Sequence, residues 1–398
     1  MDVLFVCAEA PTGERPRPHG IIAALARFGH AITLVFADQA GTTFDDLSPY
    51  CRRILPVRHE RDLVAAVRSE VASGQFDLVH LDARTAARIG RSLTVPTVVD
   101  AVTCVSQRME HTLRADGLLA RIAHTLTLAR TRRREAARLW PYNHVIVATE
   151  HDVGALSAIG VSKETGIHVY AVPSPVDLER FAPPLRLRDP ATFLLDLRDL
   201  SRHEAGLALH LVARAMPAIW VVRADARLIV LGNVAQRHAG RIAADPRLVF
   251  AGAVHDPRGH LATATVALAP LASTTAAPQA ALEALATGLP LVACSQIARD
   301  LAGTDGEHLL VADEPLALAR IALALLNDAP YRGRLGRAGR RLVGREHSWE
   351  HTAAALEDVY AAATGSALAE WRLEVGLHRP TRADQDEGRG EVRWDQAP

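Results

Sequence analysis

Short apolar runs alternate with amphipathic stretches along the first 172 residues. The apolar runs predict buried strands at 3–8, 31–37, 76–81, 97–100, 145–148 and 168–172. Between them, the spacing of apolar residues predicts helices at 21–28, 62–73 and 106–139. Strands that alternate with helices are typical of a parallel sheet covered on both faces, so this half is predicted to be a doubly wound α/β domain.

A proline-rich stretch separates this half from a second one. It predicts a linker, and its prolines are Pro173, Pro175, Pro183, Pro184 and Pro190. The alternation then restarts, with predicted strands at 192–196, 227–231, 248–251, 265–269 and 291–293 and predicted helices at 205–220 and 278–287. We therefore predict the following parts: an N-terminal domain at 1–172, a linker at 173–190, a C-terminal domain at 191–347, a closing helix at 348–365 and a mostly disordered tail at 366–398.

The size and charge of the chain fit an ordinary globular protein. Its 398 residues exceed what one hydrophobic core usually holds, which agrees with two domains. Lys+Arg and Asp+Glu are equal at 45 each, so net charge gives no general reason to expect a nucleic-acid partner. No apolar run approaches the roughly 20 residues that span a bilayer, and the apolar start is too short for a signal peptide.

The four cysteines predict neither a disulfide framework nor a metal site. Cys7, Cys51, Cys104 and Cys294 are scattered, with no Cys-x-x-Cys pair and no histidine at zinc-like spacing. Cysteines used in this way fit a reducing compartment. We therefore expect a cytoplasmic protein without a metal.

One segment of the second half carries a specific resemblance. Residues 281–292 read Ala-Leu-Glu-Ala-Leu-Ala-Thr-Gly-Leu-Pro-Leu-Val, which resembles the Leu-Glu-Ala-Met-Ala-x-Gly-x-Pro-Val-Val signature of the family 4-like (group 1) glycosyltransferases. Segments 172–181, 227–232, 249–252 and 348–350 resemble further elements of that family, in the same order. Within the family, Val98-Val99-Asp100 followed by Ser106 is similar to the exopolysaccharide-system sugar transferases.

The resemblance implies the GT-B architecture, in which two Rossmann-like domains face a central cleft and a C-terminal helix returns to the N-terminal domain. It also implies an enzyme that moves a sugar from a nucleotide-sugar donor to a saccharide or lipid-linked acceptor, in polysaccharide or glycoconjugate biosynthesis. Such transfer would be retaining and metal-independent, and the nucleotide-sugar is a substrate, so no cofactor is expected. The alternative is a degenerate GT-B protein that binds or scaffolds without turnover.

The predicted helix at 278–287 supplies most of the implied donor site. Its N-terminal N–H groups suit a diphosphate. The resemblance makes Glu283 the acceptor of hydrogen bonds from ribose hydroxyls, although a solvated helix charge is an alternative reading. Two further candidates for the donor site are Gln279, at the start of the helix, and Gly252, after the strand 248–251.

Other donor-site positions depart from the family pattern. Thr275 stands where the family has the first Glu of its Glu-x7-Glu motif, and Leu197 replaces a glycine after the strand 192–196. Arg198 and Arg202 are the candidate cations for the diphosphate, but salt bridges to neighbouring carboxylates would also explain Arg202. Lys163 is the only lysine, which leaves such roles to arginine or histidine and argues against a phosphorylase, which needs a cofactor lysine.

The N-terminal half offers candidates for the acceptor side. His19 and Gly20 lie in the loop and helix after the first strand, where the family's glycine-rich loop faces the cleft, and simple capping of that loop is the alternative. Asp100 and His80 end two strands, at the edge of the sheet where open α/β folds bind ligands. Helix capping for Asp100 and a structural role for His80 are equally open. No catalytic base is assigned.

A basic run marks the helix predicted before the strand 145–148. Residues 130–138 include five arginines, with Leu126, Leu128 and Trp140 nearby. Such a helix either docks on anionic lipid at the inner face of a membrane or presents an ordinary solvated face. Both interpretations remain open at the level of the sequence.

Overall fold

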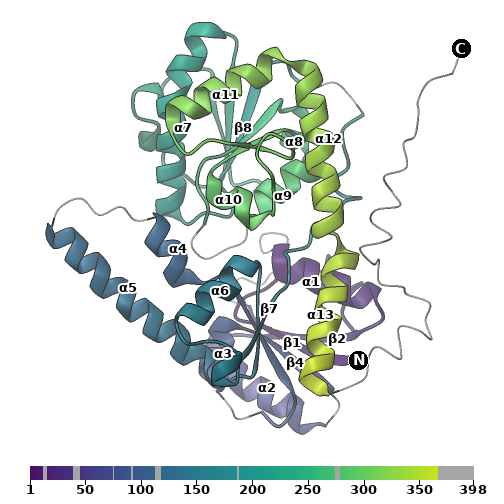
Figure 1. The fold of residues 1–398 in the computed structure, drawn as a ribbon. Helices are drawn as coiled ribbons and strands as arrows, with labels where there is room; N and C mark the ends of the chain where they lie inside the picture. The colour runs from purple at the N-terminus through teal and green to yellow at the C-terminus, as the bar shows by residue number, and fades with distance from the viewer. Residues whose placement is uncertain are drawn as a thin grey trace, which may run out of the picture.

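The computed structural model describes residues 1–11, 16–38, 45–74, 76–90, 93–112, 118–185, 188–273 and 278–365. Thr275 and the predicted tail at 366–398 lie outside these described residues. Two parallel sheets are present, and helices pack on both faces of each (Figure 1). The doubly wound α/β class predicted for both halves is therefore confirmed.

The N-terminal sheet has seven parallel strands in the order β3-β2-β1-β4-β5-β6-β7. They are β1 (Asp2–Cys7), β2 (Ala31–Ala37), β3 (Arg53–Val57), β4 (Leu78–Asp82), β5 (Thr97–Val102), β6 (His144–Val147) and β7 (His168–Ala171). The sequence did not predict β3, because this short edge strand has no fully buried residue and Pro56 interrupts its apolar residues.

Helices cover both faces of this sheet. They are α1 (Pro16–Arg27), α2 (Leu63–Ala72), α3 (Ala83–Ile89), α4 (Val105–Thr112), α5 (Leu118–Leu139) and α6 (Glu150–Ala158), with the short 3-10 helices η1 (Glu60–Asp62) and η2 (Lys163–Thr165). The single helix predicted at 106–139 is thus two helices, α4 and α5. Figure 1 shows α5 on the outside of the domain, next to α3 and α4.

The C-terminal sheet has six parallel strands in the order β10-β9-β8-β11-β12-β13. They are β8 (Thr192–Asp196), β9 (Arg227–Leu231), β10 (Leu248–Gly252), β11 (Val266–Ala269), β12 (Leu291–Ala293) and β13 (Leu310–Val311). In both sheets the strand order reverses beside the first strand, between β1 and β4 and between β8 and β11. Ligands of open α/β folds bind at this point, outside the carboxyl ends of the strands.

The C-terminal helices include one that is long and apolar. They are α7 (Arg202–Val222), α8 (Arg258–Thr263), α9 (Gln279–Ala286), α10 (Ser295–Asp300), α11 (Pro315–Asn327) and α12 (Ala329–Glu346), with η3 (Gln236–Ile242) as a 3-10 helix. By length and composition α7 is the one described helix that could cross a membrane, but more than half of its apolar window is buried inside the protein. Its buried side chains form the core of this domain with those of α11 and the sheet.

The last described helix, α13 (Trp349–Thr364), returns to the N-terminal domain and packs on α1. Figure 1 shows α12 along the C-terminal domain and α13 along the N-terminal one. Tyr360 of α13 is fully buried, and its hydroxyl lies 2.8 Å from Nδ1 of His80. The chain therefore passes between the domains twice, once through the proline-rich linker and once between α12 and α13.

Candidate donor site between the domains

The centre of the site is an ion cluster at the carboxyl end of β8. The Arg198 guanidinium donates from Nε and Nη2 to the Asp196 carboxylate, at 2.6 to 3.0 Å, and from Nη2 to Oε2 of Glu283 at 2.6 Å. Glu283 is only 4% exposed, which excludes a solvated helix charge. The structure thus brings together Arg198 and Glu283, two residues predicted for the donor site.

The charges of this cluster are strongly coupled. Burial raises the pKa of Glu283 to about 7, and the neighbouring Arg198 opposes that rise. Although burial disfavours the charge of Arg198, the Asp196 and Glu283 carboxylates raise its pKa above the ordinary value. Nη1 of Arg198 has two N–H groups, and it makes no hydrogen bond to the residues that the structure describes. These two N–H groups are therefore available to a ligand anion.

The sequence pattern predicted an open phosphate site at the N-terminus of α9, but a side chain of the protein itself occupies part of it. Asp199 follows the Arg198 turn, and its Oδ2 accepts a hydrogen bond from the Ala280 backbone N–H at 2.6 Å. Burial, followed by the Asp196 charge, raises the pKa of Asp199 to about 6. The chain therefore places its own carboxyl group where a ligand phosphate was predicted to bind.

Residues of both domains and of the linker line a small cavity beside this cluster. It has a volume of about 50 Å³, and its lining includes His19 and Gly20 of α1, Asp177 and Arg180 of the linker, His255, Gln279 and Trp349. Small-molecule pockets in proteins usually measure several hundred Å³. This cavity is therefore smaller than an ordinary small-molecule site.

Gln279 has an unsatisfied acceptor in this cavity. Its Nε2 donates to the Pro175 carbonyl oxygen at 3.2 Å, while its buried Oε1 has no hydrogen-bond partner in the described part of the chain. A buried unsatisfied oxygen is costly. A ligand hydroxyl or N–H group would satisfy it.

The second cation at the cavity is Arg180, which was not among the site residues predicted from the sequence. Arg180 is exposed and lines the cavity, and Asp177 Oδ1 accepts a hydrogen bond from its backbone N–H at 2.9 Å. Arg202, the predicted second cation, is the exposed first residue of α7 and does not line the cavity. Arg180 could have been predicted from its position in the proline-rich linker, because a linker between two domains passes beside the cleft between them.

His19 and Gly20 lie at the cavity as predicted, with different roles. His19 is 3.6 Å from the Asp46 carboxylate, but burial lowers the pKa of its imidazole. Gly20 is a packing residue, because a Cβ added there would lie 2.7 Å from Cγ of Pro175. Gly252 ends β10 with a φ of +72°, and its carbonyl oxygen accepts from Gly232 N at 2.7 Å, away from the cavity.

The two acceptor-side candidates are engaged within the N-terminal domain. Both carboxylate oxygens of Asp100 accept from the buried Arg17 guanidinium, at 3.0 and 3.2 Å, and Arg17 also donates to the linker at Val172 O and Ser174 Oγ. His80 is fully buried and stacks on Phe5, and this burial lowers its pKa to about 4. The structure thus places His80 in the core.

A buried ion pair joins the two domains beside the site. Arg108 of α4 lies 2.9 Å from the Asp300 carboxylate of α10 and 3.4 Å from Asp152 of α6, and it also donates to the Ser273 carbonyl oxygen at 3.1 Å. The side chains of Arg108, Asp152 and Asp300 are at most 3% exposed. Desolvated charges of this kind tolerate the loss of a partner poorly.

Comparisons with known proteins agree with this architecture. Residues 200–328 match the family described as "Glycosyl transferases group 1". The sucrose-phosphate synthase of Thermosynechococcus elongatus is 17% identical, with a TM-score of 0.72, and the alignment covers 92% of this chain and 99% of that one. HepE of Anabaena, solved with UDP and glucose, is 14% identical, with a TM-score of 0.69 and coverage of 91% and 100%.

A third solved structure gives the same result. WaaG, a glycosyltransferase involved in lipopolysaccharide biosynthesis, is 16% identical, with a TM-score of 0.62 and coverage of 92% and 100%. A search of curated proteins found no match. The predicted GT-B fold and the predicted resemblance to group 1 glycosyltransferases are both confirmed, and the C-terminal domain carries the family segment.

Proposed function

We propose that this chain, with its GT-B fold and its group 1 glycosyltransferase segment, is a transferase that moves a sugar from a nucleotide-sugar to a saccharide or lipid-linked acceptor. The observation that carries the proposal is the buried Arg198–Glu283 pair, 2.6 Å apart, at the carboxyl end of β8 and beside a cavity shared by both domains. HepE, a protein of the same fold, was solved with UDP-glucose. We also propose that this transfer takes place in polysaccharide or glycoconjugate biosynthesis.

The proposed donor contacts follow from the chemistry of each group. Nη1 of Arg198 and the Arg180 guanidinium hold the diphosphate, because guanidinium donors pair with phosphate oxygens. The Glu283 carboxylate and the unsatisfied Gln279 Oε1 accept hydrogen bonds from donor hydroxyl groups. The two cations take the position that a metal would otherwise fill, so we propose transfer without a metal.

The proposed reaction replaces one bond at the anomeric carbon with another on the same face. The bond from the anomeric carbon to the diphosphate oxygen breaks, and a bond to the acceptor oxygen forms. The proton of the acceptor hydroxyl passes to the leaving phosphate oxygen. Because the leaving group accepts this proton, a side-chain base is not required, which agrees with the engagement of Asp100 by Arg17.

Binding without turnover is the second candidate, and specific observations favour it. Two carboxylates compensate the Arg198 charge, Asp199 holds the α9 N-terminus, and the cavity measures about 50 Å³. All three features reduce the room and the charge available to a diphosphate. A protein of this kind would bind a nucleotide or a sugar and transfer nothing.

Calorimetric titration with UDP, GDP and ADP, followed by a transfer assay with the sugar forms of the nucleotide that binds, tests both candidates. Glu283→Ala should weaken binding by about 1.5 to 3 kcal/mol, the value of a charge-assisted hydrogen bond. Glu307→Ala, at a glutamate whose side chain is 65% exposed, is the matched control and should bind normally. Binding with turnover supports transfer, binding alone supports the second candidate, and binding of no nucleotide contradicts both.

The same titration has an expected pH dependence. Because burial raises the pKa of Glu283 to about 7, its acceptor carboxylate becomes increasingly ionised between about pH 6 and 8. Nucleotide affinity should therefore rise over that range in the wild type. In Glu283→Gln, which cannot ionise at this position, the rise should be smaller than in the wild type.

We also propose that the protein is cytoplasmic, in a reducing compartment, and that α5 contacts anionic lipid at the inner face of the membrane. Arg130, Arg133, Arg134 and Arg138 are exposed, and Leu126 and Trp140 keep 54% and 55% of their surface. At 100° per residue, positions 126, 130, 133, 134 and 138 share one face of the helix, opposite the buried Leu128 and Leu139. All four cysteines are free thiols, which suits a reducing compartment.

A further inference from the structure

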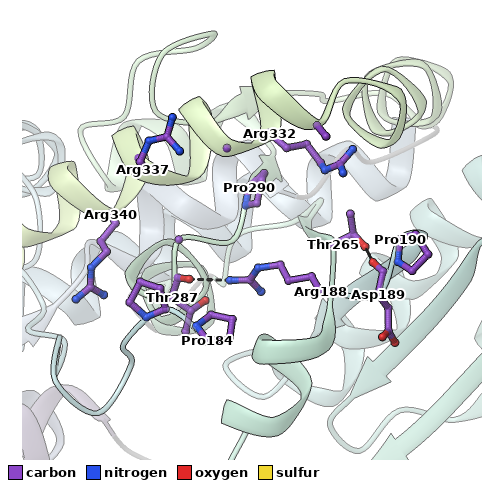
Figure 2. A pocket seen from close by; sticks show the side chains of 14 residues that line it. Pro184, Arg188, Asp189, Pro190, Thr265, Thr287, Pro290, Arg332, Arg337 and Arg340 are labelled. Carbon is purple, nitrogen blue, oxygen red and sulfur yellow. Dashed lines mark hydrogen bonds between the residues drawn. The ribbon is translucent and has the colours of Figure 1, made fainter. Parts of the chain in front are cut away.

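A second hollow, which we call the arginine pocket, lies at the amino ends of the strands of the C-terminal sheet. The cavity beside Arg198 and Glu283 lies at their carboxyl ends. The arginine pocket is lined by Arg188, Arg332, Arg337 and Arg340 together with prolines, and it measures about 440 Å³. Thr265 and Pro290, also in its wall, immediately precede β11 and β12, so the pocket opens at the amino ends of the strands. Figure 2 shows Arg188 reaching beneath α12, which carries the other three arginines.

The positive charge of this pocket is largely uncompensated. Arg188 donates to Leu261 O, Ala264 O and Thr287 O, Arg332 to Leu325 O and Leu326 O, and Arg340 to Phe181 O, Ala286 O and Leu178 O. Backbone carbonyls orient a guanidinium but do not neutralise it. Against these four arginines, Asp189 is the one carboxylate among the described residues of the wall.

Burial affects three of these cations, because Arg188, Arg332 and Arg340 are half-buried while Arg337 is exposed. It lowers the pKa of Arg188 to about 10, and it also lowers the pKa of Arg332 and of Arg340. The Asp328 carboxylate partly offsets this effect at Arg332, and an anion that enters the pocket would offset the cost of the remaining desolvated charge. The pocket is therefore electrostatically suited to a negatively charged ligand.

Donors also remain for such a ligand. A guanidinium has five N–H groups, and the bonds above leave two on Arg188 and three on Arg332. Arg337 makes no hydrogen bond or ion pair with the residues that the structure describes. Its Nη1 lies 3.3 Å from the position that a Cβ on Gly333 would occupy, so this glycine lets the side chain lie close against α12.

We propose that the arginine pocket binds a small organic phosphate, with the phosphate on the guanidinium groups and the organic part against Pro183, Pro184, Pro190 and Pro290. The volume lies in the range of small-molecule sites and exceeds what inorganic phosphate needs. This ligand is distinct from the proposed sugar donor, because the arginine pocket is at the amino ends of the strands and the proposed donor site is at their carboxyl ends. This inference does not depend on the proposed glycosyl transfer.

The test is a calorimetric titration with ribose 5-phosphate, with inorganic phosphate as a second probe, in about 0.15 M salt, where charges farther than about 8 Å apart are screened. Arg337→Glu is the variant of choice, because Arg188, Arg332 and Arg340 also hold backbone carbonyls and their loss would disturb the fold. Arg334→Glu is the matched control, since it makes the same charge change on α12 but does not line the pocket.

Ribose 5-phosphate should bind the wild type more tightly than inorganic phosphate does. Arg337→Glu should weaken its binding by about tenfold or more, and Arg334→Glu should leave it nearly unchanged. Binding should persist in Glu283→Ala, which separates this pocket from the donor site. Lack of binding to the wild type, equal affinity in Arg337→Glu, or loss of binding in Glu283→Ala would each overturn the proposal.

Discussion

At the residue scale, carboxylates decide what the donor cavity can accept. Asp196 and Glu283 share the Arg198 guanidinium, and Asp199 takes the Ala280 N–H group at the start of α9. A diphosphate bound at the proposed donor site would therefore meet a positive charge that is partly compensated. The exposed Arg180 supplies cationic charge that no described carboxylate pairs with directly.

Gly20 offers a test of how closely α1 packs on the linker. Gly20→Ala would place a methyl group 2.7 Å from Cγ of Pro175, whose ring has little freedom to move. We expect the free energy of unfolding to fall by about 1 to 3 kcal/mol, although alanine normally favours a helix. Chemical denaturation of the two proteins measures this difference.

Gly154→Ala is the matched control for that substitution. Gly154 lies within α6 (Glu150–Ala158), and a Cβ added there meets nothing within 4 Å. This variant should be as stable as the wild type or more stable, by up to about 1 kcal/mol. Equal effects at the two glycines would show that the contact with Pro175 is not restrictive.

At the scale of elements, the two long helices α5 and α7, one in each domain, differ in how much of their surface is buried. The apolar α7 is a core helix, while α5 leaves an arginine-rich face uncovered. Periodicity predicted both as helices. Their surroundings differ because α7 packs against α11 and the sheet, whereas α5, in the part whose side chains are described, buries Leu128, Ala136 and Leu139 along one side.

The uncovered face of α5 leads to a prediction for membranes. The double variant Arg133→Glu/Arg134→Glu should bind vesicles of phosphatidylglycerol and phosphatidylcholine more weakly than the wild type, by about 2 kcal/mol or more. Cosedimentation measures this, with pure phosphatidylcholine vesicles as the neutral reference. Arg214→Glu/Arg241→Glu, at two exposed arginines of the C-terminal domain, is the control. If both double variants bind equally well, α5 is an ordinary solvated helix.

At the scale of the whole molecule, the domains are joined by the linker, by α13 and by the buried Arg108. Arg108→Met would leave the Asp152 and Asp300 carboxylates buried without their cation, a loss worth about 3 to 5 kcal/mol in comparable pairs. We expect the cleft to open in this variant. Small-angle scattering should show a larger radius of gyration.

Arg132→Met is the control for this effect. Arg132 pairs with Glu110 at 2.6 Å, but both side chains are more than 40% exposed, and such pairs contribute little. Its radius of gyration should match that of the wild type. An unchanged radius in Arg108→Met as well would mean that the linker and α13 alone hold the domains together.

Strand and helix positions were largely predictable from the sequence, because period and composition are local properties. The exceptions show the limit of that information. The edge strands β3 and β13 were not predicted, because Pro56 interrupts the first and the second is only two residues long, so their pairing partners define them. Similarly, the one helix predicted at 106–139 corresponds to α4, which ends at Thr112, and α5, which begins at Leu118.

The sequence by itself determined the α/β class and the GT-B resemblance, and it predicted the linker and the choice of Arg198 and Glu283 for a donor site. Local pattern and residue chemistry are sufficient for these conclusions. Only the tertiary structure decided that Arg180 rather than Arg202 lines the cavity and that Asp100 is held by Arg17. It also placed four arginines around the pocket at the amino ends of the C-terminal strands. The reason is that a long side chain acts where the packing of distant segments directs it, and that packing is not encoded in any one stretch of sequence.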